Sequence, residues 1–377
     1  MTKAVEKQCV PVNEPVFCGN EKKYLLECIE SGWISSEGPF VGRFEEEFSA
    51  GVGRRYGVAV SSGTAALDIA VAALGIGEGD EVIMPTFTII SCAQAVVRAG
   101  GKPVLVDSNA DTWNMDVNQI EEKITSRTKA VMVVHIYGLC VDMGPVLELA
   151  DKYKLKVIED AAQAHGQTYR SRACGSFGDV SIFSFYPNKL VTTGEGGMVV
   201  TDDELTAERC KSLRNLCFQK GRRFVHEELG WNYRMTNLQA AVGLAQLEQL
   251  DGFVVRKRRM GARYTELLGG IDGLHLPVTG TDCEENIYWV YGIVADERSG
   301  LNAEQVMSRL ADKGIGARPF FWPMHEQPVF RKNGLFEGQC YPVAERLARQ
   351  GFYLPSGLGL GDEQMEYVAG CIRKLFA

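Results

Sequence analysis

The sequence lacks the features that mark several large classes of protein. No apolar run approaches the roughly 20 residues that a membrane-spanning helix needs. The N-terminus has no basic region followed by an apolar core, so we expect no signal peptide. Lysine and arginine number 40 against 48 aspartate and glutamate residues, so the net charge is −8 and no basic surplus is available to neutralise phosphates. We therefore expect neither a membrane nor a nucleic acid as partner.

Patterns typical of disulfides and metal sites are missing as well. The 11 cysteines are scattered without a C-x-x-C pair, and the five histidines lie far apart in the sequence. Such spacing does not suggest a zinc site. We therefore expect no metal, and we expect reduced thiols in a cytoplasmic protein.

Short apolar segments alternate with helical segments from about residue 56. The strand candidates are 57–60, 81–84, 103–106, 130–134, 156–159, 179–183 and 196–201. Strands with helices in most crossovers predict a largely parallel sheet that is buried on both faces. In such sheets ligands bind beyond the carboxyl ends of the strands. From about residue 270 the composition changes, which favours a second, small α+β domain.

Residues 61–67 (SSGTAAL) follow a strand and open a helix. Gly63 permits a close approach of the backbone, Thr64 adds a hydroxyl, and the amides of a helix N-terminus suit a phosphate dianion. The alternative is an ordinary helix cap without a ligand, which Ser or Thr in this position usually is.

The stretch 157–200 holds several chemical groups close together. Asp160 ends an apolar strand, where its carboxylate could keep a pyridine nitrogen protonated or could simply cap the next helix. Ser184 and Lys189 are five residues apart, so one short segment could bring a hydroxyl to a phosphate and an amine to an aldehyde. The glycine turn at 194–197 follows, a context less typical of a surface lysine. Together these groups suit pyridoxal 5'-phosphate (PLP).

These motifs resemble those of the DegT/StrS-type sugar aminotransferases, and the resemblance covers nearly the whole chain. The motifs that carry it are, in order, 32–35 (GWIS) with 38–39, 61–67, 85–88 (PTFT), 159–166 (EDAAQAHG), 184–185 with 188–189, 194–197 (GEGG) and 230–235 (GWNYRM). The resemblance implies an α/β fold, the PLP-dependent transferase fold type I of aspartate aminotransferase. It implies a large, mostly parallel PLP-binding domain at 1–250, including the leading N-terminal segment. A small α+β domain with its linking helix would follow at 251–377.

The same resemblance implies roles for individual cofactor-binding residues. Lys189 would form the internal aldimine with PLP and act as base and acid. Asp160 would pair with the pyridine nitrogen, and Gln163 would lie by the ring hydroxyl. The phosphate would be held by Gly63, Thr64 and Ser184.

One position departs from the pattern of the family. In many relatives the residue after the last Thr of the P-x-x-T motif is aromatic and covers the cofactor ring, whereas here it is Ile89. Ile89 could form an apolar wall, and Phe87 is a second candidate for the covering role.

The resemblance also implies a homodimer with shared active sites, because Asn232 would reach the phosphate in the partner subunit. The alternative for Asn232 and Arg234 is a loop that merely caps the helix at Met235. The substrate-binding residues that we predict are Ser35, Thr88, Tyr186, Arg234 and His325.

The implied reaction is a ping-pong transamination from L-glutamate to a nucleotide-linked keto sugar, with pyridoxamine phosphate as the intermediate form of the cofactor. Segment 318–325 could be core packing, but it also resembles GDP-perosamine synthases, which aminate C4 of GDP-4-keto-6-deoxymannose. Arg222 and Arg223 are candidates for the diphosphate. The alternatives are UDP- or dTDP-linked acceptors, a sugar dehydratase, in which histidine replaces the lysine at position 189, and a non-catalytic PLP-binding regulator.

Overall fold

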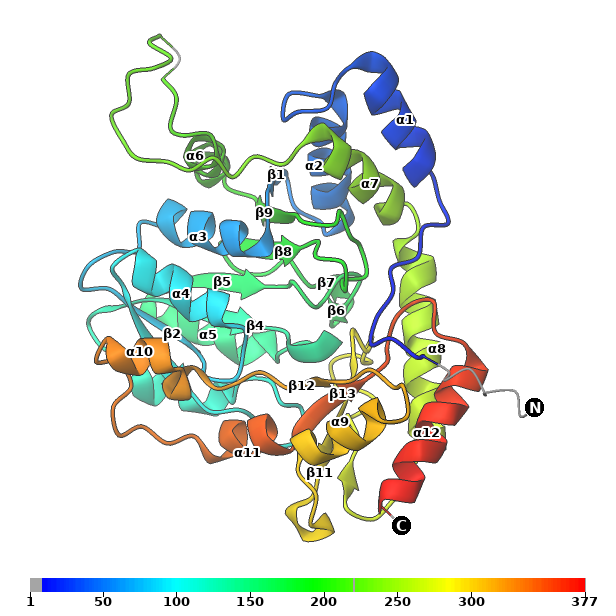
Figure 1. Ribbon diagram of the computed structural model, residues 1–377. Helices are drawn as coiled ribbons and strands as arrows, with labels where there is room; N and C mark the ends of the chain where they lie inside the picture. Colours follow the sequence, from blue (N-terminus) through cyan, green and yellow to red (C-terminus); the bar gives the residue numbers. More distant parts are fainter. Residues whose placement is uncertain (1–8, 220, 377) are drawn as a thin grey trace.

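A seven-stranded sheet forms the centre of the computed structural model, which describes residues 9–219 and 221–376 (Figure 1). Its strands are β1 (Tyr56–Val60), β2 (Glu81–Pro85), β3 (Lys102–Val106), β4 (Thr128–Val134), β5 (Lys156–Asp160), β8 (Val180–Ser184) and β9 (Gly197–Thr201). They lie in the order β1-β9-β8-β5-β4-β2-β3. The neighbouring pairs β3-β2, β2-β4, β4-β5 and β5-β8 are parallel. Strand β9 is antiparallel to both of its neighbours, β1 and β8. The predicted, largely parallel sheet is therefore confirmed.

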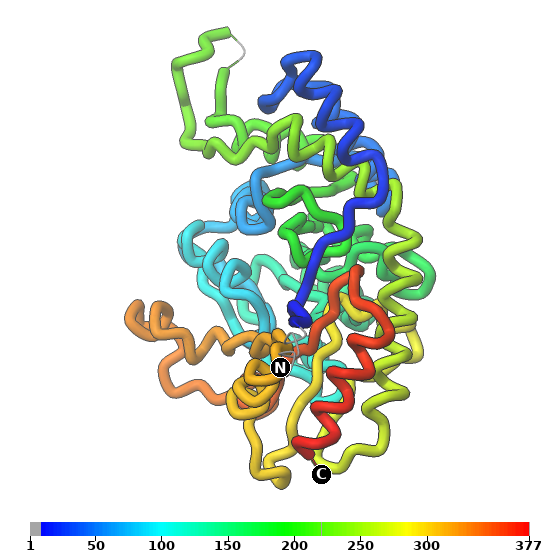
Figure 2. Tube along the Cα trace, turned by 45° about the vertical axis from the view of Figure 1, so that its right-hand side comes forward, coloured from blue at the N-terminus to red at the C-terminus, as the bar shows by residue number. Residues whose placement is uncertain are grey.

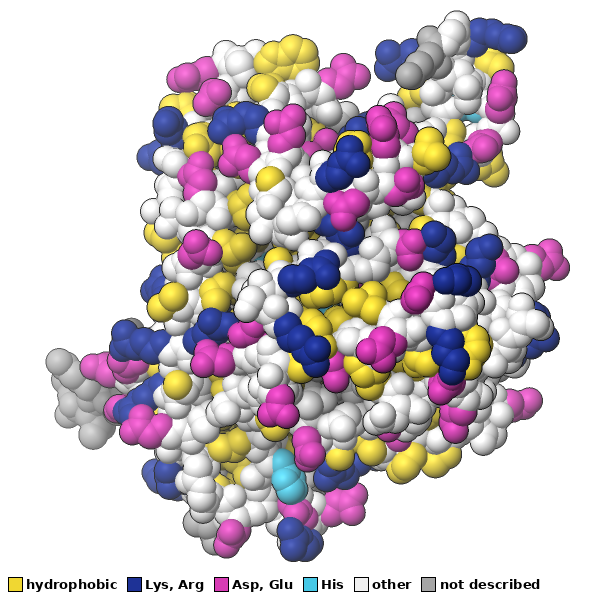
Figure 3. Space-filling view, turned by 180° about the vertical axis from the view of Figure 1, so that it is seen from behind, with side chains coloured by type: hydrophobic (Ala, Val, Ile, Leu, Met, Phe, Trp, Pro, Cys, Tyr) yellow, Lys and Arg dark blue, Asp and Glu magenta, His cyan; other side chains and the backbone are white. Residues whose placement is uncertain are grey.

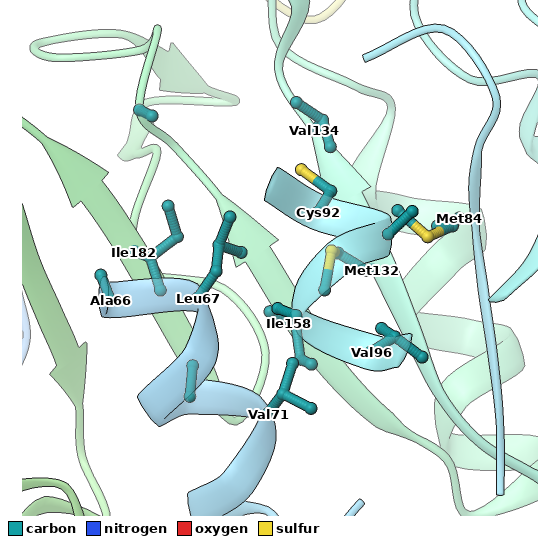
Figure 4. Close-up of a cluster of buried hydrophobic side chains, with 14 of the residues drawn as sticks. Ala66, Leu67, Val71, Met84, Cys92, Val96, Met132, Val134, Ile158 and Ile182 are labelled. Atoms are coloured by element: carbon teal, nitrogen blue, oxygen red, sulfur yellow. The ribbon is translucent and has the colours of Figure 1, made fainter. Parts of the chain in front are cut away.

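Helices cover both faces of this sheet. The helices in this part of the chain are α2 (Pro39–Gly51), α3 (Gly63–Ala73), α4 (Ile90–Arg98), α5 (Met143–Tyr153), α6 (Glu204–Arg214) and α7 (Asn237–Leu247). Figure 4 shows α3 and α4 packed through Leu67, Val71 and Val96 against strand residues such as Ile158. The preceding residue of β5, Val157, belongs to the core on the opposite face with α2, α5 and α7. Because both faces are buried, Val157 and Ile158 are two consecutive apolar residues rather than one apolar and one polar residue.

A second, four-stranded antiparallel sheet has the order β10-β11-β13-β12. Its strands are β10 (Leu274–His275), β11 (Tyr291–Ala295), β12 (Arg318–Pro319) and β13 (Gly351–Leu354). The helices around it are α9 (Ala303–Ala311), α10 (Pro328–Lys332), α11 (Pro342–Gln350) and α12 (Asp362–Phe376). The sequence did not predict β13, which has only four residues and directly follows a helix. A strand that short has no periodicity of its own to reveal it.

The remaining elements are short or connect these parts. They are α1 (Glu21–Ser31), α8 (Leu250–Leu268), the hairpin of β6 (Thr168–Tyr169) and β7 (Arg172–Ala173), and the 3₁₀ turns Val117–Gln119, Glu121–Lys123, Ile136–Gly138, Glu297–Ser299 and Met324–Glu326. The long helix α8 leads from the large sheet to the small one. Within the described ranges, no helix combines the length and apolar character needed to cross a membrane.

The N-terminal segment runs along the body to the small sheet, as the blue tube in Figure 2 shows. The backbone of Val10 exchanges hydrogen bonds with Gly314 and Gly316, at 2.9 and 2.8 Å. Further on, the Asn13 side-chain amide donates to the carbonyl of Pro187 at 3.1 Å. The segment that we grouped with 1–250 thus contacts both parts, and the domain boundary at residue 250 stays a prediction.

The buried strand β5 allows a direct test of this architecture. Ile158→Ala removes a fully buried side chain beneath α3 and α4, and we expect the free energy of unfolding to fall by about 2 to 5 kcal/mol. Urea denaturation would measure it. Leu205→Ala, at a position that is 80% exposed on α6, is the control and should change stability by less than about 0.5 kcal/mol. Equal effects of the two substitutions would contradict the assigned core.

Candidate active site

A cavity of about 620 Å³ opens beyond the carboxyl ends of β5 and β8. Most of the predicted site residues line it: Gly63, Thr64, Ile89, Asp160, Gln163, Ser184, Tyr186 and Lys189. The fold therefore brings together residues from three separate motifs at the edge of the sheet where parallel strands end.

The N-terminus of α3 forms one end of the cavity. Ser62 caps the helix, because its hydroxyl accepts a hydrogen bond from the amide of Ala65 at 3.1 Å. Gly63 lies so close to β8 that a Cβ added there would be 2.7 Å from Cβ of Ser184. Thr64 follows, with its hydroxyl 2.9 Å from that of Ser91. Helix amides and hydroxyls gathered around a glycine fit a phosphate group.

Asp160 lies deeper in the cavity and is 2% exposed. Its Oδ1 accepts a hydrogen bond from the amide of Ala162 at 3.0 Å, and its Oδ2 accepts one from the thiol of Cys92 at 3.2 Å. Burial raises the pKa of this carboxyl. A buried carboxylate with only these two donors is stabilised by a cationic partner, and the protonated pyridine nitrogen of PLP fits that requirement.

The neighbouring Glu159 supports the strand end from the other face. Its carboxylate pairs with Nε2 of His135 at 2.9 Å and accepts hydrogen bonds from the amides of Gly175 and Phe177 and from the hydroxyl of Ser181. Possible ligand atoms of His135, Glu159 and Cys174 lie within 4.8 Å of one another. Because both carboxylate oxygens already accept hydrogen bonds, we interpret this group as a buried network that supports β5.

The side-chain oxygen of Gln163 accepts a hydrogen bond from the amide of Tyr137 at 2.8 Å. This contact fixes the orientation of the side-chain amide, because only its oxygen can accept. The donor end of Gln163 has no protein acceptor in the described part of the chain, and the residue lines the cavity. An N–H directed at the cavity fits the ring hydroxyl of PLP.

Lys189 is half-buried in the cavity wall, and its Nζ lies 3.8 Å from the centre of the Trp289 indole. Burial lowers the pKa of its amine to about 7, although the charge of Asp160 acts in the opposite direction. At pH 7 about half of such amines are neutral, and the neutral amine can act as a nucleophile and as a base.

The structure places Ile89, rather than Phe87, at the cavity. Ile89 is 40% exposed and lines the cavity, whereas Phe87 is fully buried against Tyr137, Phe320 and Phe321. An apolar wall at Ile89 is therefore compatible with the fold, and Phe87 cannot cover a ring without leaving the core.

Four of the five predicted substrate-binding residues lie outside the cavity lining, and two of these, Thr88 and His325, are buried. Thr88 is buried, with its hydroxyl 3.6 Å from Sγ of Cys92. His325 is buried between the hydroxyl of Thr86 at 2.8 Å and the carboxylate of Glu345 at 3.1 Å. Since both ring nitrogens of His325 already have protein partners, its substrate contact stays a prediction, as does that of Thr88.

Ser35 and Arg234 both line a second hollow of about 480 Å³. Three cationic residues line it as well: Lys211, Arg214 and Arg223. The guanidinium of Arg234 donates to the side-chain oxygen of Asn215 at 2.7 Å. Asn232 is exposed and lines neither this hollow nor the first cavity. Arg223 lies in the hollow while Arg222 does not. The roles of these residues stay predictions.

Sequence reasoning missed part of the lining. The missed residues include Asn13, Ser91, Trp289, Arg318 and Tyr353. Most come from the N-terminal segment or the small sheet, and only the fold brings them near Lys189. Ser91, the second residue of α4 and three residues after the PTFT motif, is the one that its place in the sequence could have indicated.

The α/β scaffold, the phosphate-binding helix end, the buried carboxylate and the lysine of lowered pKa define a PLP-dependent enzyme. The chain belongs to the DegT/DnrJ/EryC1/StrS aminotransferase family, whose profile matches residues 18–373. PLP is its cofactor, and it is a sugar aminotransferase of fold type I.

Individual relatives match nearly the whole chain. It is 42% identical to the GDP-perosamine synthase of Escherichia coli O157:H7 over 98% of this chain and 99% of that protein. It is 40% identical to the GDP-perosamine synthase of Caulobacter vibrioides, over 96% of this chain and 97% of that protein. Among solved structures, the aminotransferase TlmJ of Streptoalloteichus hindustanus superposes with a TM-score of 0.90 at 30% identity, covering 97% and 98% of the two chains. The structure of S. venezuelae DesV superposes with a TM-score of 0.87 at 37% identity, and 94% of each chain is covered.

The contact between Gly63 and Ser184 can be tested by adding one methyl group. Gly63→Ala should displace Ser184 from the phosphate end at a cost of about 1 to 3 kcal/mol and weaken PLP binding about tenfold or more. Equilibrium binding of PLP to the apoprotein would measure this. Gly42→Ala is the matched control, because a Cβ there meets nothing within 4 Å. Unchanged PLP affinity in Gly63→Ala would contradict the assigned phosphate end.

Proposed function

We propose that this enzyme transfers the amino group of L-glutamate to a nucleotide-linked 4-keto-6-deoxy sugar, and specifically converts GDP-4-keto-6-deoxymannose to GDP-perosamine. The observation that carries this proposal is the nearly full-length similarity to two GDP-perosamine synthases, combined with a complete set of cavity residues around Lys189. A lysine at this position favours transamination over the sugar dehydratase alternative.

The side chains of the cavity have separable tasks in this reaction. PLP, when bound, supplies an electron sink for the negative charge that develops on the substrate carbon. Asp160 keeps the ring nitrogen protonated, and Gln163 donates to the ring hydroxyl. Lys189, with its pKa of about 7, takes the proton from the substrate carbon of the donor and later returns one to the acceptor.

The role of Lys189 predicts a change in colour. Wild-type protein reconstituted with PLP should absorb visible light, and Lys189→Ala should lose the band of the lysine-bound cofactor together with nearly all transaminase activity. Absorbance spectra and an L-glutamate half-reaction would show both. Lys154→Ala, at an exposed lysine on the end of α5, is the control and should keep both properties. A colourless wild-type protein would contradict the enzyme assignment.

The acceptor can be identified with a panel of sugars. We expect GDP-4-keto-6-deoxymannose to gain an amino group in the presence of L-glutamate, as detected by mass, at a much higher rate than UDP- or dTDP-linked 4-keto sugars. Conversion of UDP- or dTDP-linked sugars alone would replace the proposed acceptor. Conversion of a 3-keto sugar alone would show that the proposed ring position is wrong.

We also propose a homodimer in which each subunit completes the active site of the other. In its support, large apolar side chains are exposed on and after α1: Leu26, Ile29, Trp33 and Ile34. The segment between α6 and α7 stands out from the body, as Figure 3 shows from behind, and Phe224 and Leu229 on it are more than four-fifths exposed. Asn232, at the base of this segment, is exposed as a contact with a partner requires.

The shared site predicts complementation between two inactive variants. Asn232→Ala and Lys189→Ala should each be nearly inactive, whereas their mixture, after dissociation and reassociation, should recover about a quarter of wild-type activity. Half of the randomly formed dimers are mixed, and each of these holds one intact site. Gel filtration would confirm the dimer. An inactive mixture that contains mixed dimers would contradict sharing through Asn232.

A cytoplasmic location belongs to the same proposal. Its support is that all 11 cysteines have free thiols, as is usual in a reducing compartment. The proposed product would serve O-antigen and lipopolysaccharide biosynthesis, as the family resemblance implies.

A further inference from the structure

We propose that Trp289 is the positioning residue for the reactive lysine: its indole ring holds the Lys189 amine toward the cavity while its N–H fixes the peptide that precedes Lys189. This inference rests on the proposed function, because it concerns the same lysine. No sequence motif pointed to Trp289, which precedes β11 of the small sheet.

Two contacts from this one side chain converge on Lys189 and the peptide before it. The ring centre of Trp289 lies 3.8 Å from Nζ of Lys189. The indole Nε1 donates a hydrogen bond to the carbonyl of Asn188 at 2.7 Å. Within residues 9–219 and 221–376, no side-chain hydrogen bond or ion pair holds Nζ of Lys189. The indole is therefore the group that limits where this flexible side chain points.

Trp289 can act as a fixed platform because its own position is determined from several sides. It is 5% exposed, and its ring stacks on Tyr137 with centroids 6.1 Å apart. Its amide passes so close to Gly138 that a Cβ added there would be 2.5 Å away. Its carbonyl accepts a hydrogen bond from Nζ of Lys257 at 2.7 Å. The backbone of Trp289 is thus held by a buried lysine of α8 and by the turn after β4.

The contact also has an electrostatic consequence. The face of an indole attracts an ammonium group, whereas burial disfavours the charged form of Lys189. The charge of Asp160 also favours the ammonium form, and His165 is a further titratable group that interacts with this amine. Burial is the largest effect, and it lowers the pKa of the amine to about 7. Removing the ring while keeping the site apolar should therefore lower that pKa and leave the amine without a defined direction.

The inference is tested by the rate at which the apoprotein captures PLP covalently, measured from the visible band as a function of pH. In wild type the rate should rise through a midpoint near pH 7 and reach a plateau, because only the neutral amine attacks the aldehyde. We expect Trp289→Leu to reduce the plateau about tenfold or more and to move the midpoint down by about 0.5 to 1 pH unit. Trp289→Phe, which keeps a ring but loses the N–H, should keep the midpoint and show a smaller loss of plateau rate.

The matched control is Trp113→Leu, which removes a buried tryptophan from the same aromatic cluster, where it packs on Tyr137 and Phe320. It should lower stability while leaving the plateau and midpoint of PLP capture unchanged. If Trp289→Leu captures PLP like the wild type, or if Trp113→Leu changes the capture equally, the positioning role is wrong. Failure of the wild type to capture PLP would instead contradict the proposed function, so the two failures can be told apart.

Discussion

The parallel pairing of β5 with β8 is the constraint on which the site depends. It places Asp160 opposite Ile182, so that the carboxylate at the end of one strand and the hydroxyl of Ser184 at the end of the other face the same edge. The close approach of Gly63 to Ser184 then seats the N-terminus of α3 against that edge. A cofactor with a ring nitrogen at one end and a phosphate at the other fits between these two points.

The wall of the cavity opposite this edge is formed by the small sheet, by the residues before β11 and by the N-terminal segment. Trp289 and Arg318 line the same cavity as Asp160, and Asn13 ties the N-terminal segment to the peptide at Pro187. The position of Lys189 is thus determined by contacts from both sheets. A shift of the small sheet relative to the large one would therefore change the position of the amine. The densely packed aromatic cluster around the indole of Trp289 opposes such a shift.

Much of the large sheet and of the cofactor end could be predicted from the sequence. Strands buried on both faces are rich in apolar residues and can be recognised in the sequence. Asp160 ends such a strand, and Gly63 and Lys189 lie three and five residues after the ends of two others, so the local pattern also locates these site residues. Trp289 could not be predicted, because a tryptophan before a short strand reads as core packing. Thr88 and His325 are buried among protein partners, and their contact with the substrate stays a prediction. The orientation of such side chains depends on tertiary contacts that no local pattern encodes.

The comparison of Lys189 with Lys257 shows why chemistry alone does not identify a reactive lysine. Burial lowers the pKa of both amines to about 7. Lys257 uses its amine to donate to the carbonyls of Trp289 and Ser356, and is held in place by them. In the part of the chain that the structure describes, the amine of Lys189 has no such acceptors, and Lys189 lines a cavity with Asp160 and the end of α3. A lowered pKa is therefore common to the structural and the reactive lysine. The difference between them is whether the amine is free to react with a ligand. Trp289 links the two lysines, because its backbone carbonyl accepts a hydrogen bond from the structural lysine while its indole ring faces the reactive one.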